Sequence, residues 1–367
     1  MLRTLLDDTQ LTCPSCRGLV DGEVQEHALF LAASHAEVDG NVVHGMLGCR
    51  GCGTQYPIVD GVPVVLRDVA GWLRQQERAV FGRSDLPCAL DHWLRAAWPD
   101  DQDPSWHRQM LAVYGATLGD DPVSRDPFLA ELDQTRRRTQ RFLDTRRQEA
   151  LSHYERGALV LDAGAAVGES ALSFAAHGAR VLAVDTDFGA LRVLSRLLRE
   201  GSVELPRWRH AGNDYVSTTV TLPKGVDPAR VLPIAADAAA PPVHAELFDV
   251  VAAYNLLDNV PDPVLLLRQL HAVLRPGGRL LVASPFDWVS RCTPPHARLG
   301  EGLRANAGDG ADAAEALVAL LEGRLPFVAP ELAFRVTHRE DLPWILPRHR
   351  RSAHVFATHY VEAVKLE

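Results

Sequence analysis

The sequence predicts an α/β protein built on a doubly wound, mostly parallel sheet, with a small metal-binding module in front of it. Two observations carry this prediction. Strand-like and helix-like segments alternate with short loops from residue 158 onward, and two Cys-x-x-Cys pairs lie within the first 52 residues. Such alternation is typical of a parallel sheet with helices on both faces.

The composition is that of a soluble globular chain long enough for two or three domains. The 367 residues are 47% hydrophobic and 23% charged, with no run of 18 apolar residues, so no membrane contact is expected. The first residues, MLRTLLDDTQ, lack a hydrophobic signal core, which predicts a cytoplasmic protein. The net charge of −9 argues against a general nucleic-acid-binding surface, although it leaves room for a local basic patch.

The two cysteine pairs predict a structural zinc site. Cys13 and Cys16 form the first pair, Cys49 and Cys52 the second. Four thiolates suit tetrahedral Zn²⁺, and a four-cysteine site leaves no open position for catalysis. Free or redox-active cysteines are the alternative.

The segment after the second pair predicts a β-hairpin that closes this module. In YPIVDGVPVVL, residues 56–66, apolar runs flank an Asp-Gly turn. With CPSCRG and CRGCGT before it, this string resembles the small zinc-ribbon family that includes the activator subunit of eukaryotic tRNA and release-factor methyltransferases. The resemblance covers roughly residues 8–68, and it implies a module that partners methyltransferase domains, here fused in the same chain.

The middle segment, residues 69–150, is predicted to be helical. Its tryptophans and proline breaks fit short helices that connect and pack on both neighbouring domains. The alternative is a lid over an active site, with Tyr114 or His107 facing the substrate. The run QTRRRTQRF, which holds Arg136 to Arg138, is interpreted as a solvated helix face, with an RNA contact as the alternative.

The elements of the main domain, residues 151–367, follow from their periodicity and punctuation. Apolar runs predict buried strands, and amphipathic stretches that end near glycine predict helices. The predicted strands cover 158–164, 179–185, 248–258 and 279–285, and the predicted helices cover 168–178, 188–201 and 262–278.

The loop after the first of these strands, VLDAGAAVGES, carries the ligand prediction. Asp162-x-Gly164-x-Ala166-x-Gly168 does not fit the dinucleotide pattern G-x-G-x-x-G. Glycines here would let the backbone approach a ligand without Cβ clashes. An acid at the end of the second strand, Asp185, lies where ribose hydroxyls are bound in such sheets, with Asp187 as its rival.

These motifs in this order resemble class I S-adenosylmethionine-dependent methyltransferases, over about residues 150–290. The resemblance implies a Rossmann-like sheet with S-adenosylmethionine bound at its carboxyl edge. It assigns cofactor contacts to Asp162, Gly164, Ala166, Gly168, Asp185, Asp237, Ala238 and Asn255. Ala166 stands where the family has glycine, and we expect binding to survive if φ is negative there. A degenerate, non-catalytic domain is the alternative.

The segment NLLD, residues 255–258, bears on the acceptor. Amide- and adenine-N-methylating enzymes carry an Asn/Asp-Pro-Pro-Tyr/Phe turn at this place, and that turn is missing here. Asp258 is a candidate base, with a helix cap as its alternative role.

Two later segments resemble the C-terminal methyltransferase domain of ovothiol-biosynthesis enzymes, which methylates the imidazole of a sulfur-substituted histidine. They are SPFDWVSRCTP, residues 284–294, and REDLPWILPRHRRSAHVFATHYVEAVK, residues 339–365. Asp287 would hold an ammonium or imidazole group, Trp288 would stack on a flat or cationic group, and Arg348 with His349 would meet a carboxylate. Packing in a core or lid is the alternative for Trp288 and Trp344. The catalytic candidates are thus Asp258, Asp287 and Tyr114.

The remaining segments are expected to be peripheral. Residues 299–323 suggest a flexible insertion followed by a helix, and residues 210–225 suggest a hairpin inserted between sheet strands. Cys88 and Cys292 are most simply unpaired thiols.

Together these features predict an S-adenosylmethionine-dependent methyltransferase with a zinc ribbon, acting by SN2 transfer on a small-molecule or peptide acceptor. We expect an amino-acid-like, histidine-like acceptor methylated at nitrogen. A tRNA or protein methyltransferase that docks its substrate through the ribbon is one alternative. A non-catalytic, cofactor-binding partner protein is the other, and the oligomeric state stays open.

Overall fold

The computed structural model describes the zinc-ribbon region, the main sheet and most of its connections. The described residues are 11–20, 23–76, 87, 90, 93, 127–154, 157–208, 215–300, 312–325, 329–349 and 352–367. Tyr114, His107 and Cys88 lie outside them, as do Arg350 and Arg351, and the side chain of Arg348 is also outside this description.

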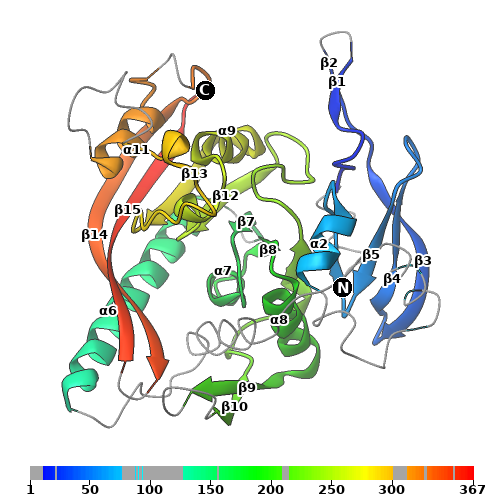
Figure 1. Ribbon diagram of the computed structural model, residues 1–367, viewed down its shortest axis with the longest axis horizontal. Coiled ribbons are helices and arrows are strands. Elements are labelled where there is room, and N and C mark those ends of the chain that lie inside the picture. Colours follow the sequence, from blue (N-terminus) through cyan, green and yellow to red (C-terminus); the bar gives the residue numbers. More distant parts are fainter. Residues whose placement is uncertain are drawn as a thin grey trace.

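The N-terminal module is a four-stranded antiparallel sheet with a short two-stranded arm (Figure 1). A tight turn at Asp60 and Gly61, both with positive φ, joins its last two strands and confirms the predicted hairpin. Tyr56 and Ile58 fill the core of this sheet and are fully buried. The elements are β1 (Gly18–Val20), β2 (Glu23–Gln25), β3 (Leu29–Val38), β4 (Asn41–Cys49), β5 (Gln55–Val59) and β6 (Val62–Pro63), followed by α2 (Val69–Gln75).

The main domain is a seven-stranded sheet in the order β11-β8-β7-β12-β13-β15-β14. The first five strands are parallel, and β15 runs antiparallel to both of its neighbours. The four predicted strands are confirmed as β7 (Leu159–Ala163), β8 (Arg180–Asp185), β12 (Phe248–Tyr254) and β13 (Leu274–Ser284), although β12 ends at Tyr254 and not at residue 258. The other strands of the sheet are β11 (Val231–Ala235), β14 (Phe334–His349) and β15 (Ser352–Lys365).

Helices cover both faces of this sheet, as predicted. On β7, Val160 packs with one group of helices, whereas Leu159 and Leu161 pack with the other, as the alternation of strand side chains requires. The first group is α6 (Pro127–Leu151), α7 (Glu169–Ala176) and α8 (Phe188–Glu200), and the second is α9 (Pro263–Val273) and α11 (Ala313–Leu321). Figure 1 shows α6 lying along the β14–β15 pair at the left of the molecule.

Two predicted boundaries are corrected. Helix α9 ends at Val273, before the glycines, and β13 begins at Leu274. Pro276 explains this end, because proline lacks an amide hydrogen and disfavours helical geometry in the residue before it. The predicted hairpin is present, but its first strand is β9 (Ser202–Trp208), which starts earlier than expected and pairs with β10 (Tyr215–Thr221).

Helix α6 runs through the boundary predicted at residue 150 and packs on the main sheet. Arg136 is only 4% exposed, so the prediction of a solvated face for the arginine run is wrong for this residue. Asp133 explains its burial, because the carboxylate accepts hydrogen bonds from both Arg136 and Arg137. Arg138 is exposed, as predicted.

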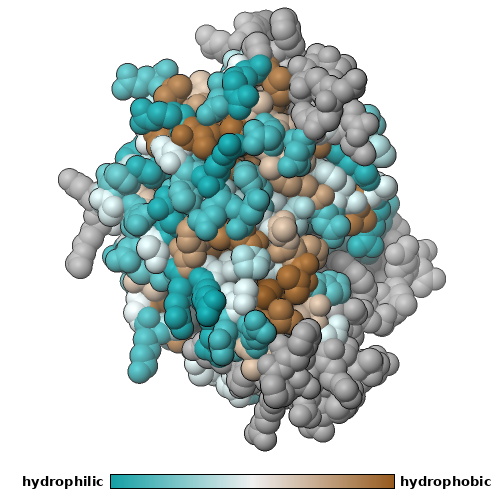
Figure 2. All heavy atoms as spheres, turned by 90° about the vertical axis from the view of Figure 1, so that its left-hand side faces the viewer, coloured by the Kyte–Doolittle hydropathy of each residue, from teal (hydrophilic) through white to brown (hydrophobic). Residues whose placement is uncertain are grey.

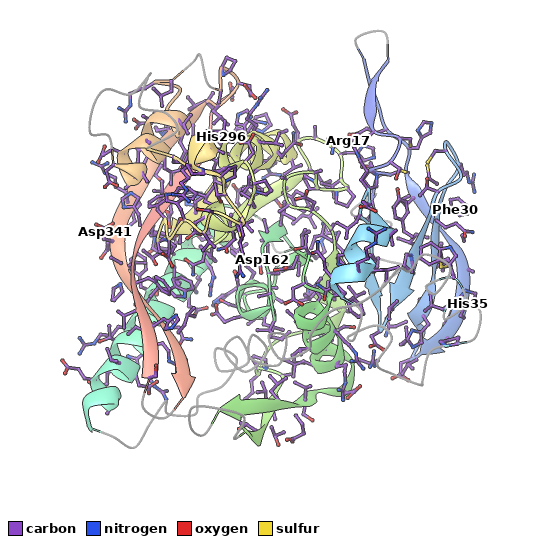
Figure 3. All side chains as sticks on the ribbon, viewed as in Figure 1. Arg17, Phe30, His35, Asp162, His296 and Asp341 are labelled. Atoms are coloured by element: carbon purple, nitrogen blue, oxygen red, sulfur yellow. The ribbon has the colours of Figure 1, made fainter. Side chains whose placement is uncertain are left out.

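The ribbon covers the outer edge of the main sheet. Val64 forms a parallel bridge with Ala235 of β11, and the amide of Val65 donates to the Ala235 carbonyl at 2.6 Å. The Trp72 indole donates to the Thr186 carbonyl at 2.8 Å. The contacts with Ala235 join the ribbon to the carboxyl end of β11. Figure 3 shows Arg17 at the base of the β1–β2 arm, where it donates to the Pro241 carbonyl at 2.9 Å.

Candidate functional site

The four predicted zinc ligands come together in the ribbon. The sulfur atoms of Cys13, Cys16, Cys49 and Cys52 all lie within 4.8 Å of one another. Cys13 and Cys52 are 3.6 Å apart, as are Cys16 and Cys49. Tetrahedral ligands at a Zn–S distance of about 2.3 Å would lie about 3.8 Å apart, so the cluster fits zinc.

Polar side chains surround this cluster and would orient the thiolates. The Tyr56 hydroxyl lies 3.0 Å from the sulfur of Cys13 and donates to the Ser15 hydroxyl. His27 Nδ1 lies 3.4 Å from the sulfur of Cys16. Partners of this kind fix ligand geometry and tune the metal, which supports a structural role for the site.

The second candidate site lies at the carboxyl edge of the main sheet, where the glycine loop leaves β7. Gly164 has a φ of 78° and Gly168 a φ of 87°. A Cβ at Gly168 would lie 2.5 Å from the Leu194 side chain of α8, and one at Gly164 would lie 3.1 Å from Leu256. These glycines therefore let the loop pack against protein neighbours, in addition to the ligand approach that the sequence predicted.

The condition under which cofactor binding is expected to survive at Ala166, a negative φ, is not met. The φ of this residue is 46°, in the left-handed region that favours glycine. The strained conformation aims the Ala166 amide at Asp185, and the amide donates to Asp185 Oδ2 at 2.8 Å. The loop therefore contacts Asp185 through this amide although residue 166 is an alanine.

The two rival acids after β8 have different surroundings. Asp185 accepts the amides of Ala166 and Asp187, while burial and the charge of Asp187 raise its pKa to about 6. Asp187 caps the N-terminus of α8 by accepting the Ala190 amide at 3.2 Å. Because the Asp187 carboxylate already serves as a helix cap, Asp185 is the better candidate to accept hydrogen bonds from ribose hydroxyls.

Asp162 lies at the centre of the molecule, near the end of β7 (Figure 3). It is 2% exposed, and burial raises its pKa to about 7 although the nearby Arg147 opposes the shift. Arg147 of α6 is 1% exposed, and its guanidinium donates to both carboxylate oxygens of Glu169 at 3.3 and 3.4 Å. The same guanidinium lies 5.1 Å from the centre of the Tyr254 ring.

Several buried polar atoms at this edge have no partner at hydrogen-bond distance among the described residues, although Ser170 lies close enough to Asp162, and Arg147 to Tyr254, to oppose the rise in pKa that burial causes. Such atoms are rare in folded proteins and indicate a missing ligand or water. They come from the end of β7, the start of α7, the end of β12 and the facing side of α6. They are Asp162 Oδ2, Ser170 Oγ, the Tyr254 hydroxyl, Asn255 Oδ1 and Arg147 Nε.

This donor set fits the methionine end of S-adenosylmethionine. An ammonium group would satisfy Asp162 and Asn255, and a carboxylate would satisfy Arg147 and Ser170. Asp237 and Ala238 follow β11 at the same edge; Asp237 is exposed and accepts the Ala239 amide at 2.8 Å. The structure thus brings the predicted cofactor residues to one edge of the sheet.

The loop after β13 is joined to the loop after β12 through Asp258. This carboxylate is 2% exposed and accepts the Asp287 amide at 2.9 Å, and burial raises its pKa. Thr293 reinforces the link by donating to the carbonyls of Asp258 and Val260. The cap of α9 is Asp262, not Asp258. Asp258 therefore holds the loop that carries Asp287 and Trp288.

The acceptor candidates on this loop differ in exposure. The Asp287 side chain is exposed, whereas Trp288 is half-buried and its ring lies 6.0 Å from that of Phe286. Trp344 of β14 lies 6.4 Å from the Tyr254 ring, on the face covered by α6. Cys292 is a free thiol, as expected.

Sequence reasoning missed Arg147, Glu169, Ser170 and Tyr254. Arg147 lies in an arginine-rich helix where nothing distinguishes it from exposed neighbours, and only the packing of α6 shows its burial. Tyr254 had a weak signal, because it is a polar aromatic residue at the end of an otherwise aliphatic strand. No helix in the described part of the chain is long and apolar enough to cross a lipid bilayer.

Comparison with known proteins agrees with this geometry. A family profile described as "Methyltransferase domain" matches residues 135–352, more than half of the chain. A profile described as "Trm112p-like protein" matches residues 10–61 and covers the four cysteines. The predicted zinc-ribbon resemblance is thereby confirmed.

Two relatives of known function match part of the chain. A demethylmenaquinone methyltransferase of Thermobifida fusca is 34% identical over 126 residues, which cover 34% of this chain and 43% of the relative. A ubiquinone biosynthesis O-methyltransferase of Marinobacter nauticus is 28% identical over 128 residues, 35% of this chain and 44% of the relative. The chain thus spans less than half of their length.

Among solved structures, magnesium protoporphyrin IX methyltransferase of Synechocystis PCC 6803 with bound SAH is similar with a TM-score of 0.40 and 16% identity. The match covers 70% of this chain and 97% of that protein. From the profile match and the sheet order, the chain belongs to the methyltransferase-domain family, whose cofactor is S-adenosylmethionine, and it carries a Trm112p-like zinc-ribbon module at its N-terminal end.

Proposed function

We propose that this protein transfers the methyl group of S-adenosylmethionine to a small-molecule acceptor. The observation that carries the proposal is the group of unpartnered buried polar atoms at the carboxyl ends of β7 and β12. Buried groups of this kind cost free energy unless a ligand or water satisfies them. A ligand that carries an ammonium and a carboxylate a few bonds apart would pair with both the acidic and the basic side chains of this group.

In this proposal the chain's residues bind and orient the reactants. Arg147 holds the carboxylate, fixed by Glu169, and Asp162 receives the ammonium directly or through water. Asp185 accepts hydrogen bonds from the ribose hydroxyls, and Asp237 accepts one from the adenine amino group. S-adenosylmethionine supplies a methyl group on a sulfonium, so the protein's main task is alignment and exclusion of water.

For the acceptor we propose an amino-acid-like molecule methylated at nitrogen. The exposed carboxylate of Asp287 and the half-buried indole of Trp288 suit a cationic or flat group. Asp258 supports this site as a positioning residue, because its carboxylate is committed to the Asp287 amide. A role for Asp258 as general base loses support from this contact.

A second candidate is an oxygen acceptor of the quinone class. The name of the Marinobacter relative favours it, since that protein is an O-methyltransferase of ubiquinone biosynthesis. The name of the Thermobifida relative, a demethylmenaquinone methyltransferase, supports the quinone class but not oxygen as the acceptor atom. The matched stretches cover about 35% of this chain.

The macromolecular and non-catalytic alternatives make a different use of the ribbon. The residues that follow its last strand already contact β11 in the same chain, through the bridge of Val64 with Ala235 and the hydrogen bond from the Val65 amide. This contact supports a structural role, in which the ribbon completes the edge of the methyltransferase sheet.

Methyl-labelled S-adenosylmethionine tests the proposal. The purified full chain is incubated with a cell extract that has been separated into small-molecule, RNA and protein fractions. Label in the small-molecule fraction is expected, and mass spectrometry of the product separates nitrogen from oxygen methylation. Label confined to RNA or protein would overturn the small-molecule acceptor. Cofactor binding without transfer to any fraction would favour the partner-protein alternative.

A further inference from the structure

A small cavity lies between α6 and the outer part of β14, beside the proposed cofactor site. Its volume is about 30 Å³, and its lining includes Arg136, Thr139, Leu143, Glu169, Trp344 and Ile345. The Thr139 hydroxyl donates to the Pro343 carbonyl at 2.8 Å and so ties α6 to β14 at this point. A space of this size admits one small polar group, such as a carboxylate, but not a whole metabolite.

The cavity contains a guanidinium with a vacant donor. Arg136 is 4% exposed, and its Nη1 has no hydrogen-bond partner among the residues that the structure describes. Its other nitrogens are engaged, since Nε and Nη2 donate to Asp133 Oδ1 at 3.1 and 2.9 Å. The Asp133 contact therefore fixes the planar group and leaves one edge for another acceptor.

The Arg136 guanidinium gives this cavity a positively charged donor. The Glu169 carboxylate also lines the cavity, but it is paired with the Arg147 guanidinium at 3.3 and 3.4 Å. The rest of the lining is mixed: Leu143, Trp344 and Ile345 are apolar or aromatic, and Thr139 and Gln140 are polar. A positively charged donor beside an indole suits an anionic group attached to a flat or apolar body.

Glu169 connects the cavity with the cofactor site. Its carboxylate lines the cavity and accepts hydrogen bonds from the Arg147 guanidinium. That guanidinium also faces Asp162 and Tyr254. Glu169 thus borders the cavity that Arg136 lines and also contacts the Arg147 guanidinium. A molecule anchored at Arg136 would extend along the same edge of the sheet as the cofactor.

We propose that Arg136 anchors the anionic group, a carboxylate or a phosphate, of the methyl acceptor. This inference rests on the proposed methyltransferase function and narrows its substrate class to acids with a flat or apolar body. It agrees with an amino-acid-like acceptor and disfavours a neutral quinol.

A binding experiment tests the anchor without any knowledge of the acceptor. Benzoate, phenyl phosphate and neutral benzamide are titrated into the full chain, and binding is measured by saturation-transfer NMR. We expect one of the two anions to bind and benzamide to bind at least tenfold more weakly, which is the scale of a charge-assisted hydrogen bond. The better of the two anions identifies the group as carboxylate or phosphate. Equal binding of benzamide, or no binding of either anion, would overturn the proposal.

Three variants localise the effect. Arg136→Gln should lose the anion preference by about tenfold or more, whereas Arg138→Gln, on the exposed side of the same helix, should bind as the unchanged chain does. Arg136→Lys keeps a charge opposite Asp133 if the glutamine variant fails to fold, and it should also lose most of the preference because an ammonium lacks the second donor edge. An unchanged preference in Arg136→Lys or Arg136→Gln would refute the anchor.

Methyl transfer then separates this inference from the function on which it rests. With labelled cofactor and the small-molecule extract, the labelled product should be retained on an anion-exchange column under conditions in which its carboxylate or phosphate is ionised. Arg136→Gln should reduce labelling while calorimetry shows unchanged cofactor affinity. Transfer to a molecule without an anionic group would refute the role of Arg136 as an anchor but would support the methyltransferase function. Absence of transfer by the unchanged chain would instead refute the methyltransferase function.

Discussion

At the scale of the residue, the strained Ala166 is the clearest departure from what its family prefers. A left-handed conformation costs a residue with a Cβ about 1–2 kcal/mol. In this conformation the Ala166 amide donates a hydrogen bond to Asp185. The strain at Ala166 is thus the energetic cost of holding Asp185, the residue that we propose binds the ribose hydroxyls.

Ala166→Gly should therefore stabilise the protein. The relief of strain is partly offset by the greater entropy of glycine in the unfolded chain, about 0.4–1 kcal/mol, so we expect a net gain of up to about 1 kcal/mol. Urea denaturation measures it. The matched control is Gly168→Ala, which places a Cβ 2.5 Å from Leu194 and should destabilise the protein. A loss of stability in Ala166→Gly would contradict the assigned strain.

The burial of Asp162 leads to a second prediction, which concerns how stability and cofactor binding depend on pH. Burial raises its pKa to about 7 in the folded protein from an ordinary value of 3.8. Between those values the folded state holds a proton that the unfolded state has lost. This group's contribution to the free energy of unfolding therefore falls as the pH rises from about 4 to 7. An ammonium beside Asp162 requires the ionised form, so cofactor binding should release a proton and strengthen with pH.

Calorimetry between pH 6.5 and 8, in two buffers with different ionisation enthalpies, measures this linkage. We expect the slope of affinity against pH, at most about tenfold per pH unit, to disappear in Asp162→Asn. If that variant binds too weakly to titrate, carboxyl NMR of the unchanged chain gives the pKa directly. A slope that survives the substitution would remove Asp162 from the ammonium site.

At the scale of the element, the sequence predicted β7, β8, β12 and β13 of the main sheet and most helices between them, because buried strands and amphipathic helices have strong periodic signals. It failed at α6. The alternation of charge in QTRRRTQRF looks like a solvated face, but Arg136 and Arg147 are buried by partners 3 and 22 residues away. A single sequence does not show which of several arginines has such a partner. The same limit hid the clustering of Glu169 with Asp162.

The attachment of α6 to β15 gives the third prediction. Glu362 is 3% exposed and accepts hydrogen bonds from Arg146 of α6 and, at 2.6 Å, from the Tyr360 hydroxyl. Glu362→Gln removes the buried charge opposite Arg146 and should cost about 2–4 kcal/mol of unfolding free energy. Denaturant unfolding measures the loss.

A surface ion pair provides the matched control for this substitution. Glu331 pairs with Arg268, and both side chains are at least one-third exposed. Because exposed pairs contribute little, Glu331→Gln should change the free energy of unfolding by no more than about 1 kcal/mol. Equal effects of the two substitutions would mean that the buried pair does not hold α6 on the sheet.

At the scale of the whole molecule, the structure adds how the two domains are joined. The motifs predicted a ribbon and a methyltransferase sheet in one chain, but the contact between them depends on backbone groups that leave no mark in the sequence. The amide of Thr12 donates to Pro242 and that of Val65 to Ala235, both at 2.6 Å. Their donors lie in the ribbon and their acceptors in the main domain.

Zinc removal should therefore weaken this joint before it disturbs the sheet. The cysteine cluster fixes the turn around Cys13, next to Thr12, and a structural zinc site loses folding free energy with its metal. After chelation, hydrogen exchange should become faster at residues 11–13 and 62–66 and remain slow at the fully buried centre of β7 around Val160. Cys13→Ser should reproduce the effect without a chelator. Uniform acceleration would mean that the main domain cannot fold without the ribbon. Unchanged exchange at residues 62–66 would mean that the strand pairing holds the ribbon without its metal.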